Sequence, residues 1–235
     1  MPALSNHAIH LKRDPMESSK TLQRFGFPAR LMCVIALLLV PLAAMAQKAP
    51  DALVRSVADD VLKIVQQDQA LREGDNAKMA RLIEEKIVPH FDFERMTKLA
   101  VGRSWREATP DQRQTLIEQF RTLLVRSYSA AYSAYRQIVI DVKPLKVQPT
   151  EEDVQVKTEI KLPGGAPPVK VDYSMVKNTE WKVYDVVVDG VSMVTTYRNT
   201  FAEEVRRGGV DGLIKTLNDM NTAKSPPPAA GVQKK

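Results

Sequence analysis

The residues in this chain that could carry acid–base chemistry are three aspartates in its second half. Asp172, Asp185 and Asp189 lie in or beside segments of alternating apolar residues, and a carboxylate buried in an apolar setting can act as a general base. Asp185 shares a strand face with Trp181 and Val183, so we expect it to be partly buried. The plainer interpretation is a structural one, in which Asp185 accepts a hydrogen bond from a nearby backbone amide or basic side chain. Asp189 suits a turn, and Asp172 the polar face of its strand.

Metal and nucleophile chemistry have weaker support. His90 is the only histidine after residue 46, and the only cysteine, Cys33, precedes that point, so zinc has no ligand set there. Acidic residues do not have the spacing of a calcium loop. Ser192 follows Gly190 and Val191 without the Gly-x-Ser-x-Gly spacing of a nucleophile elbow, and a helix cap is its simpler role. We therefore predict neither a metal, nor a cofactor, nor an enzyme.

Nucleotide and nucleic-acid binding are not indicated either. The sequence lacks glycine-rich phosphate loops, and its lysines and arginines are dispersed rather than clustered with aromatic residues. Residues 1–46 hold five basic and two acidic residues, so the net charge of +6 falls to +3 for residues 47–235. Such a mild excess favours anionic surfaces only weakly.

The N-terminal segment is typical of a signal peptide. Residues 31–42 (LMCVIALLLVPL) are an apolar run preceded by Arg24 and Arg30 and followed by the small-residue ending at 44–46. The run is shorter than the roughly 20 residues of a transmembrane helix. We expect residues 1–46 to be cleaved and the mature protein to work in the periplasm.

The remaining chain predicts helices, then a sheet, then helices. Apolar residues at helical spacing indicate helices over 51–71, 75–87, 91–101, 110–135, 192–208 and 211–220. Residues of alternating polarity indicate four strands, over 138–142, 154–162, 169–175 and 181–188. Thr109, Pro110 and Gln112 form a capping box at the start of the longest helix. We predict an α+β fold whose four-stranded antiparallel curved sheet packs against several helices.

Apolar residues exceed what one packed face requires. The stripe on the helix 110–135 is wide, and the strand 181–188 is apolar on both faces. A large core would explain this surplus, and so would a cavity lined by both elements. Tyrosines suit such a wall because the ring faces an apolar ligand while the hydroxyl stays near a polar mouth.

Several ordered motifs make the sequence similar to a known family. They are Ile87–Phe93, Leu99–Trp105, Ala108–Arg113, Phe120–Leu124, Trp181–Val186, Gly190–Met193 and Gly209–Leu213. Their order and spacing resemble the MlaC family of periplasmic phospholipid-binding proteins, also called toluene-tolerance proteins. The resemblance covers about residues 51–221.

The resemblance implies a phospholipid carrier without a catalytic residue. Such proteins hold acyl chains in an apolar cavity between a curved sheet and the surrounding helices. They exchange lipid with an inner-membrane ABC transporter bearing an MCE-domain protein and with an outer-membrane lipoprotein–porin complex, which maintains outer-membrane lipid asymmetry. On this basis residues 47–221 form a phospholipid-binding domain. Residues 222–235 lie outside the resemblance, and their composition predicts a disordered tail.

Ten residues on the long helix, on the sheet and nearby are our predicted lining of the cavity. They are Val101, Trp105, Phe120, Leu124, Tyr128, Val156, Ile160, Val171, Tyr173 and Met175. Three alternatives stay open at this point: a carrier of another apolar lipid such as a hopanoid or isoprenoid, a small enzyme on a cone-shaped α+β scaffold with Asp185 as base, and an adaptor with a filled core.

Overall fold

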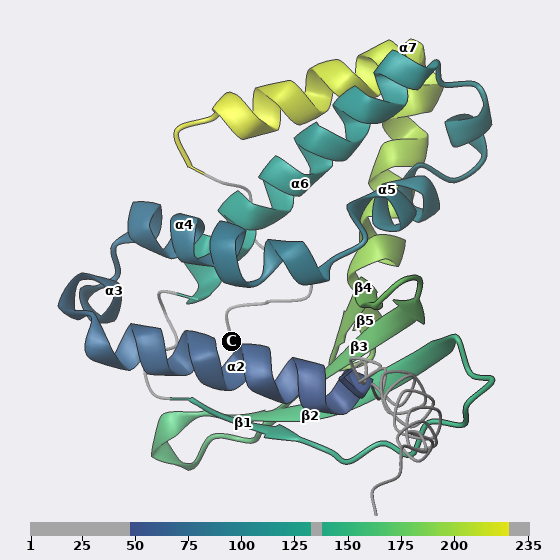
Figure 1. Ribbon diagram of the computed structural model, residues 1–235. Coiled ribbons are helices and arrows are strands. Elements are labelled where there is room, and N and C mark those ends of the chain that lie inside the picture. The colour runs from purple at the N-terminus through teal and green to yellow at the C-terminus, as the bar shows by residue number, and fades with distance from the viewer. Residues whose placement is uncertain (1–47, 133–137, 226–235) are drawn as a thin grey trace, which may run out of the picture. The chain divides into compact units, whose positions relative to one another are not determined.

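The computed structural model describes residues 48–132 and 138–225 (Figure 1). The predicted signal peptide, residues 1–46, lies outside the described residues, as do the end of the predicted helix 110–135 and most of the predicted tail. Every helix in the described part is too short or too polar to cross a bilayer.

The first half of the described chain is helical. It contains α2 (Pro50–Gln67), α3 (Gln69–Glu73), α4 (Asn76–Lys86), α5 (Phe93–Val101) and α6 (Pro110–Tyr132), with short 3₁₀ turns at Val88–His90 and Gly102–Arg106.

The predicted helix 51–71 is divided in two at Asp68. That residue has an extended backbone (φ −103°, ψ 115°), and its carboxylate accepts a 3.2 Å hydrogen bond from the Leu71 backbone N–H, which caps α3. A side chain that caps a helix start competes with helix continuation, which explains why one periodic stripe produces two helices.

The capping box before α6 is confirmed. The Thr109 backbone N–H donates to Gln112 Oε1 at 2.9 Å, and the Gln112 N–H donates to Thr109 Oγ1 at 3.2 Å. Both bonds satisfy backbone donors that a helix start leaves without an intrahelical partner.

The sheet has five strands in the described residues rather than the four we predicted. In sheet order they are β1 (Val139–Val142), β2 (Asp153–Lys161), β3 (Val169–Lys177), β4 (Trp181–Val188) and β5 (Val191–Ser192), and every neighbouring pair is antiparallel. The additional strand arises because Asp189 (φ 47°) and Gly190 (φ 85°) form a two-residue turn. This turn pairs Val191 and Ser192 with β4 before the next helix begins.

The last helix, α7 (Met193–Thr222), begins and breaks where the sequence indicates. Ser192 caps it by accepting a 3.0 Å hydrogen bond from the Thr195 N–H. Gly208 and Gly209 interrupt it with non-helical backbone, and Gly209 has a φ of 67°, which separates the two predicted helices.

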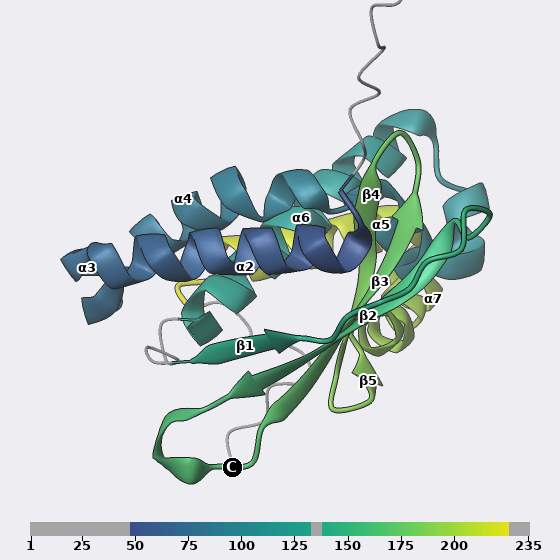
Figure 2. The ribbon, with the colours of Figure 1, turned by 60° about the horizontal axis from the view of Figure 1, so that its bottom comes forward.

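The sheet is twisted (Figure 2), and the apolar residues of its strands lie on one face. Along β2 the buried Val156 and Thr158 alternate with the exposed Gln155 and Lys157. The main core joins this inward face to α5, α6 and α7, and a second cluster joins α2, α3, α4 and α6. The fold is therefore α+β, with a sheet that is apolar on one side.

Candidate functional site

An apolar pocket of about 330 Å³ lies between α2 and the inward face of the sheet. Eight of its lining residues come from α2 and follow one face of that helix: Leu53, Val54, Val57, Ala58, Val61, Leu62, Val65 and Gln66. Their spacing at intervals of three and four residues places them on a single stripe, because a helix turns once every 3.6 residues.

The sheet supplies the opposite wall. Its lining residues alternate along the strands, as the two-residue period of a strand requires: Ile140, Ile160, Val169, Val171, Tyr173, Met175, Val183, Val186 and Val188. The register brings Tyr173 opposite Val186, and a bulge between Ser174 and Met175 re-aims the residues that follow. Leu124, Val125 and Tyr128 of α6 and Met79 and Ile83 of α4 complete the wall.

The structure brings six of the ten predicted lining residues into this pocket. They are Leu124, Tyr128, Ile160, Val171, Tyr173 and Met175. That these six contact lipid stays a prediction.

The other four predicted residues lie in the packed core instead of in the pocket wall. Phe120 packs edge-on against Tyr197 and Phe201, with ring centroids 5.0 and 5.1 Å away. Trp105 lies under the guanidinium of Arg113, 5.5 Å from the ring centroid. Val101 and Val156 are also buried in the core that α5, α6 and α7 share with the sheet. None of these four residues is among those that line the pocket.

The stripe on α2 is the part of the lining that sequence reasoning missed. Its periodicity predicts a helix, but the ten predicted residues include none from it. A signal was present: within 51–71 the apolar stripe is long, and a stripe needs an apolar partner. The phenylalanines Phe91 and Phe93, stacked with centroids 5.8 Å apart, also line the pocket and were not predicted.

The polar groups of the lining are few. Gln66 and Asp189 are exposed members, and His90 is half-buried. Burial lowers the pKa of His90, and the nearby charge of Lys182 lowers it further, so the neutral ring is favoured. Asp189 accepts a 3.0 Å hydrogen bond from the Lys170 backbone N–H. The described lining contains neither lysine nor arginine, so its walls offer hydrocarbon contact rather than anion binding.

Asp185, the candidate general base, has a structural role. Its Oδ1 accepts hydrogen bonds from the backbone N–H groups of Val186 (2.8 Å) and Val194 (3.1 Å), and Ser192 Oγ donates to its Oδ2 at 2.6 Å. The carboxylate therefore ties β4 to the first turn of α7, and it is not among the residues that line the pocket. The predicted hydrogen bond to a backbone amide is confirmed.

The other candidates for chemistry are dispersed. Asp172 lies opposite Lys157 in the register of β2 and β3. Within 48–132 and 138–225 there is no group of three histidine, cysteine or acidic side chains that could hold a metal ion. The pocket, with its apolar walls, is thus the candidate functional site.

Comparisons with known proteins agree with this geometry. The family model described as MlaC protein matches residues 55–219. Two relatives are the intermembrane phospholipid transport system binding protein MlaC of Haemophilus influenzae and the toluene tolerance protein ttg2D of Pseudomonas putida. The first is 24% identical over 80% of this chain and 89% of its own length. The second is 25% identical over 79% of this chain and 86% of its own length.

A solved structure extends the similarity to three dimensions. It is a phospholipid-binding protein from Ralstonia solanacearum in complex with a phospholipid, 37% identical to this chain, with a TM-score of 0.68. The match covers 74% of this chain and 97% of that one. Together with the family match over most of the described residues, this similarity shows that the chain belongs to the MlaC family.

Proposed function

We propose that this protein binds phospholipid by its acyl chains in the apolar pocket and carries it across the periplasm. The observation that carries the proposal is the pocket itself, whose walls on α2, α6 and the sheet are almost entirely apolar. Support comes from the Ralstonia solanacearum protein, which shares 37% of its sequence with this chain and holds a phospholipid.

The hydrophobic effect explains why such a carrier is needed. Two acyl chains contain roughly 30 methylenes, and each costs about 0.8 kcal/mol in water, so a bare lipid would cost about 24 kcal/mol to move. A protein lowers this cost only if it offers the chains an interior nearly as apolar as the membrane. The α2 stripe and the inward residues of β2, β3 and β4 offer such an interior.

The headgroup has a different environment. The described lining lacks lysine and arginine, and its exposed members are Gln66 and Asp189. A phosphate placed among the apolar walls would lose its hydration without gaining a cationic partner, which is costly. The headgroup accordingly stays in water at the rim, and the protein selects lipids by their acyl chains.

Membership of the MlaC family supports the cellular setting that we propose. Residues 1–46 act as a signal peptide that directs the protein to the periplasm. There it exchanges lipid with an inner-membrane ABC transporter bearing an MCE-domain protein and with an outer-membrane lipoprotein–porin complex, and so maintains outer-membrane lipid asymmetry. The carrier performs no catalytic step, and the transporter supplies the energy.

Extraction of the purified protein with organic solvent, followed by mass spectrometry, tests the proposal. The extract should contain phospholipid well above the amount recovered from an unrelated periplasmic protein purified in parallel. A hopanoid or isoprenoid in its place would support a carrier of another apolar lipid. An extract without lipid would contradict the proposal and favour the adaptor.

A further inference from the structure

The pocket is small for a whole phospholipid. Its volume of about 330 Å³ lies at the lower end of the range of about 300–1,000 Å³ for pockets that bind small molecules, and a lipid with two acyl chains is larger than most such ligands. If the proposed function is correct, at least one wall of the pocket must move when a lipid enters.

The wall with the fewest buried residues is α2. Of its 18 residues only Pro50 and Val61 are buried. Part of its apolar stripe packs against α4, and eight residues of the helix line the pocket. The opposite wall is held by continuous antiparallel pairing of β2 with β3 and of β3 with β4. Moving α2 therefore breaks fewer contacts than opening the sheet.

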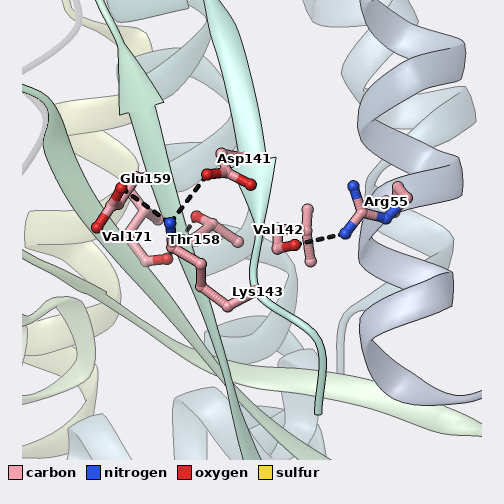
Figure 3. A network of polar contacts seen from close by, with 7 residues as sticks. All are labelled: Arg55, Asp141, Val142, Lys143, Thr158, Glu159 and Val171. Carbon is pink, nitrogen blue, oxygen red and sulfur yellow. Dashed lines mark hydrogen bonds and ion pairs between the residues drawn. The ribbon is translucent and has the colours of Figure 1, made fainter.

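Two polar contacts hold the N-terminal half of α2 against the sheet. The Arg55 guanidinium donates a hydrogen bond to the Val142 carbonyl (Figure 3), and the Leu145 backbone N–H donates to Asp51 Oδ2 at 3.2 Å. Both side chains come from α2, and both partners are backbone groups at or just beyond the end of β1. Because β1 is an edge strand, it has peptide groups that no neighbouring strand pairs.

The edge strand is itself anchored. Figure 3 shows the Lys143 ammonium between the carboxylates of Asp141 on β1 and Glu159 on β2, at 2.9 and 3.0 Å. The contacts of Arg55 and Asp51 thus connect α2 to a strand end that is tied to the rest of the sheet.

The C-terminal end of α2 has the features of a hinge. The helix stops at Asp68, which is extended and forms a 2.5 Å ion pair with Lys78. Beyond it, α3 and α4 are anchored by the buried Leu71, Met79 and Leu82. A rotation at Asp68 would move α2 while α3 and α4 stay in place.

We propose that Arg55 and Asp51 are positioning residues that clasp α2 over the pocket and so set the rate at which lipid enters and leaves. The inference rests on the proposed function, because only a ligand that passes this wall gives the clasp a role. The clasp closes the pocket whether or not lipid is inside. Weakening it speeds entry and release alike and changes equilibrium occupancy much less.

The test measures the release rate of a labelled lipid. The full 235-residue chain is expressed, and the protein purified from the periplasm is loaded with a fluorescent phosphatidylethanolamine. It is then mixed with excess vesicles of phosphatidylethanolamine and phosphatidylglycerol that carry a quencher. Arg55→Met removes the donor and keeps an unbranched stem, whereas Arg55→Lys keeps a donor. Asp51→Ala removes the acceptor, whereas Asp51→Asn keeps an oxygen.

Release should be roughly 3- to 10-fold faster for Arg55→Met and for Asp51→Ala, the effect of losing about one hydrogen bond. The release rate of Arg55→Lys should be closer to that of the wild type than the rate of Arg55→Met is. The rate of Asp51→Asn should likewise be closer to the wild type than the rate of Asp51→Ala is. Equilibrium lipid content should change by less than twofold in all four. A merely structural role would lower lipid content and thermal stability together, without this separation of rate from occupancy.

Lys63→Met is the matched control, since Lys63 is an exposed cation on the same helix. Release as fast from this variant as from Arg55→Met would overturn the clasp, as would wild-type rates in both Arg55→Met and Asp51→Ala. If Arg55→Met does not fold, the release rates and lipid contents of Asp51→Ala and Asp51→Asn test the clasp in the same way. A wild-type protein that cannot be loaded with the lipid would overturn the proposed function and the clasp with it, whereas equal rates overturn the clasp alone.

Discussion

The two apolar regions of this domain differ in what fills them. Between α5, α6 and α7 the core is solid, and Phe120 has no exposed surface where it meets Tyr197 and Phe201. Between α2 and the sheet the side chains face a pocket instead of one another. One helix serves both regions, because Phe120 of α6 points into the solid core while Leu124 and Tyr128, one and two turns later, line the pocket.

This difference shows how one domain combines a stable packed core with space for a ligand. Close packing in the solid region supplies dispersion contacts that the pocket walls lack. The pocket walls recover such contacts when a ligand fills the space, and a ligand that binds only the folded state stabilises it further. The solid half should therefore tolerate truncation poorly, and the pocket half should respond to truncation and filling through ligand binding.

The sharpest test of this comparison uses two neighbouring leucines on α6. Leu123 is fully buried in the solid core, whereas Leu124 lines the pocket. Leu123→Ala should lower the free energy of unfolding by about 2 to 5 kcal/mol, because it opens a new cavity in packed surroundings. Leu124→Ala should cost less, because it enlarges a space that already exists. Urea denaturation of delipidated protein measures both, and an equal loss would contradict the distinction.

Filling the pocket should reduce lipid binding while the fold persists. Leu124→Trp and Tyr173→Trp place a larger ring among the lining residues. We expect each to lower the phospholipid recovered per protein by more than half, with a thermal midpoint near that of the wild type. Unchanged lipid in both variants would show that the lining is elsewhere. Phe91→Tyr, which adds only a hydroxyl to the lining, serves as a milder comparison.

Asp185→Asn separates a structural carboxylate from a catalytic one. The variant weakens the hydrogen bonds that join β4 to the first turn of α7, so we expect a loss of about 1 to 2 kcal/mol in unfolding free energy. Lipid content per folded protein should stay unchanged. If the variant kept full stability and abolished turnover of a substrate, the enzyme alternative would gain support. Asp172→Asn, on the polar face of β3, is the control.

The smallest expected effect is on the pH dependence of stability. Burial and the charge of Lys182 lower the pKa of His90 below 6.5, so the unfolded chain binds the proton more tightly than the folded one. The contribution of His90 to stability is then fully present above pH 6.5 and is lost as the pH falls through the lower pKa of the folded state. His90→Gln should flatten the unfolding free energy over this window. An identical pH profile in both proteins would show that His90 does not contribute.

Local features of the sequence predicted local structure well. Thr109 with Gln112, and Ser192, are caps in the structure as predicted, because a cap involves residues three apart in the chain. The division at Asp68 and the two-residue strand β5 were missed. Both depend on whether a few residues form a turn or continue into a helix, and the spacing of apolar residues does not reveal this.

The candidate site was predictable only in part. Alternation on β3 correctly placed Val171, Tyr173 and Met175 on one face, and that face lines the pocket. The same rule placed Val156 on the inward face of β2, but it could not separate a packed neighbour from a pocket wall. Whether an inward-facing residue is packed or lines the pocket depends on which helix lies opposite it. The helix opposite the pocket, α2, comes from the start of the described chain, far in sequence from the strands.

By itself the sequence determined the α+β order of elements, their caps and faces, and the family to which the chain belongs, because all of these follow from near neighbours and ordered motifs. Only the tertiary structure decided which apolar stripe meets a partner and which faces space. Burial is a property of two surfaces brought together, and the position of α2 is set by contacts such as that of Arg55 with Val142, 87 residues apart.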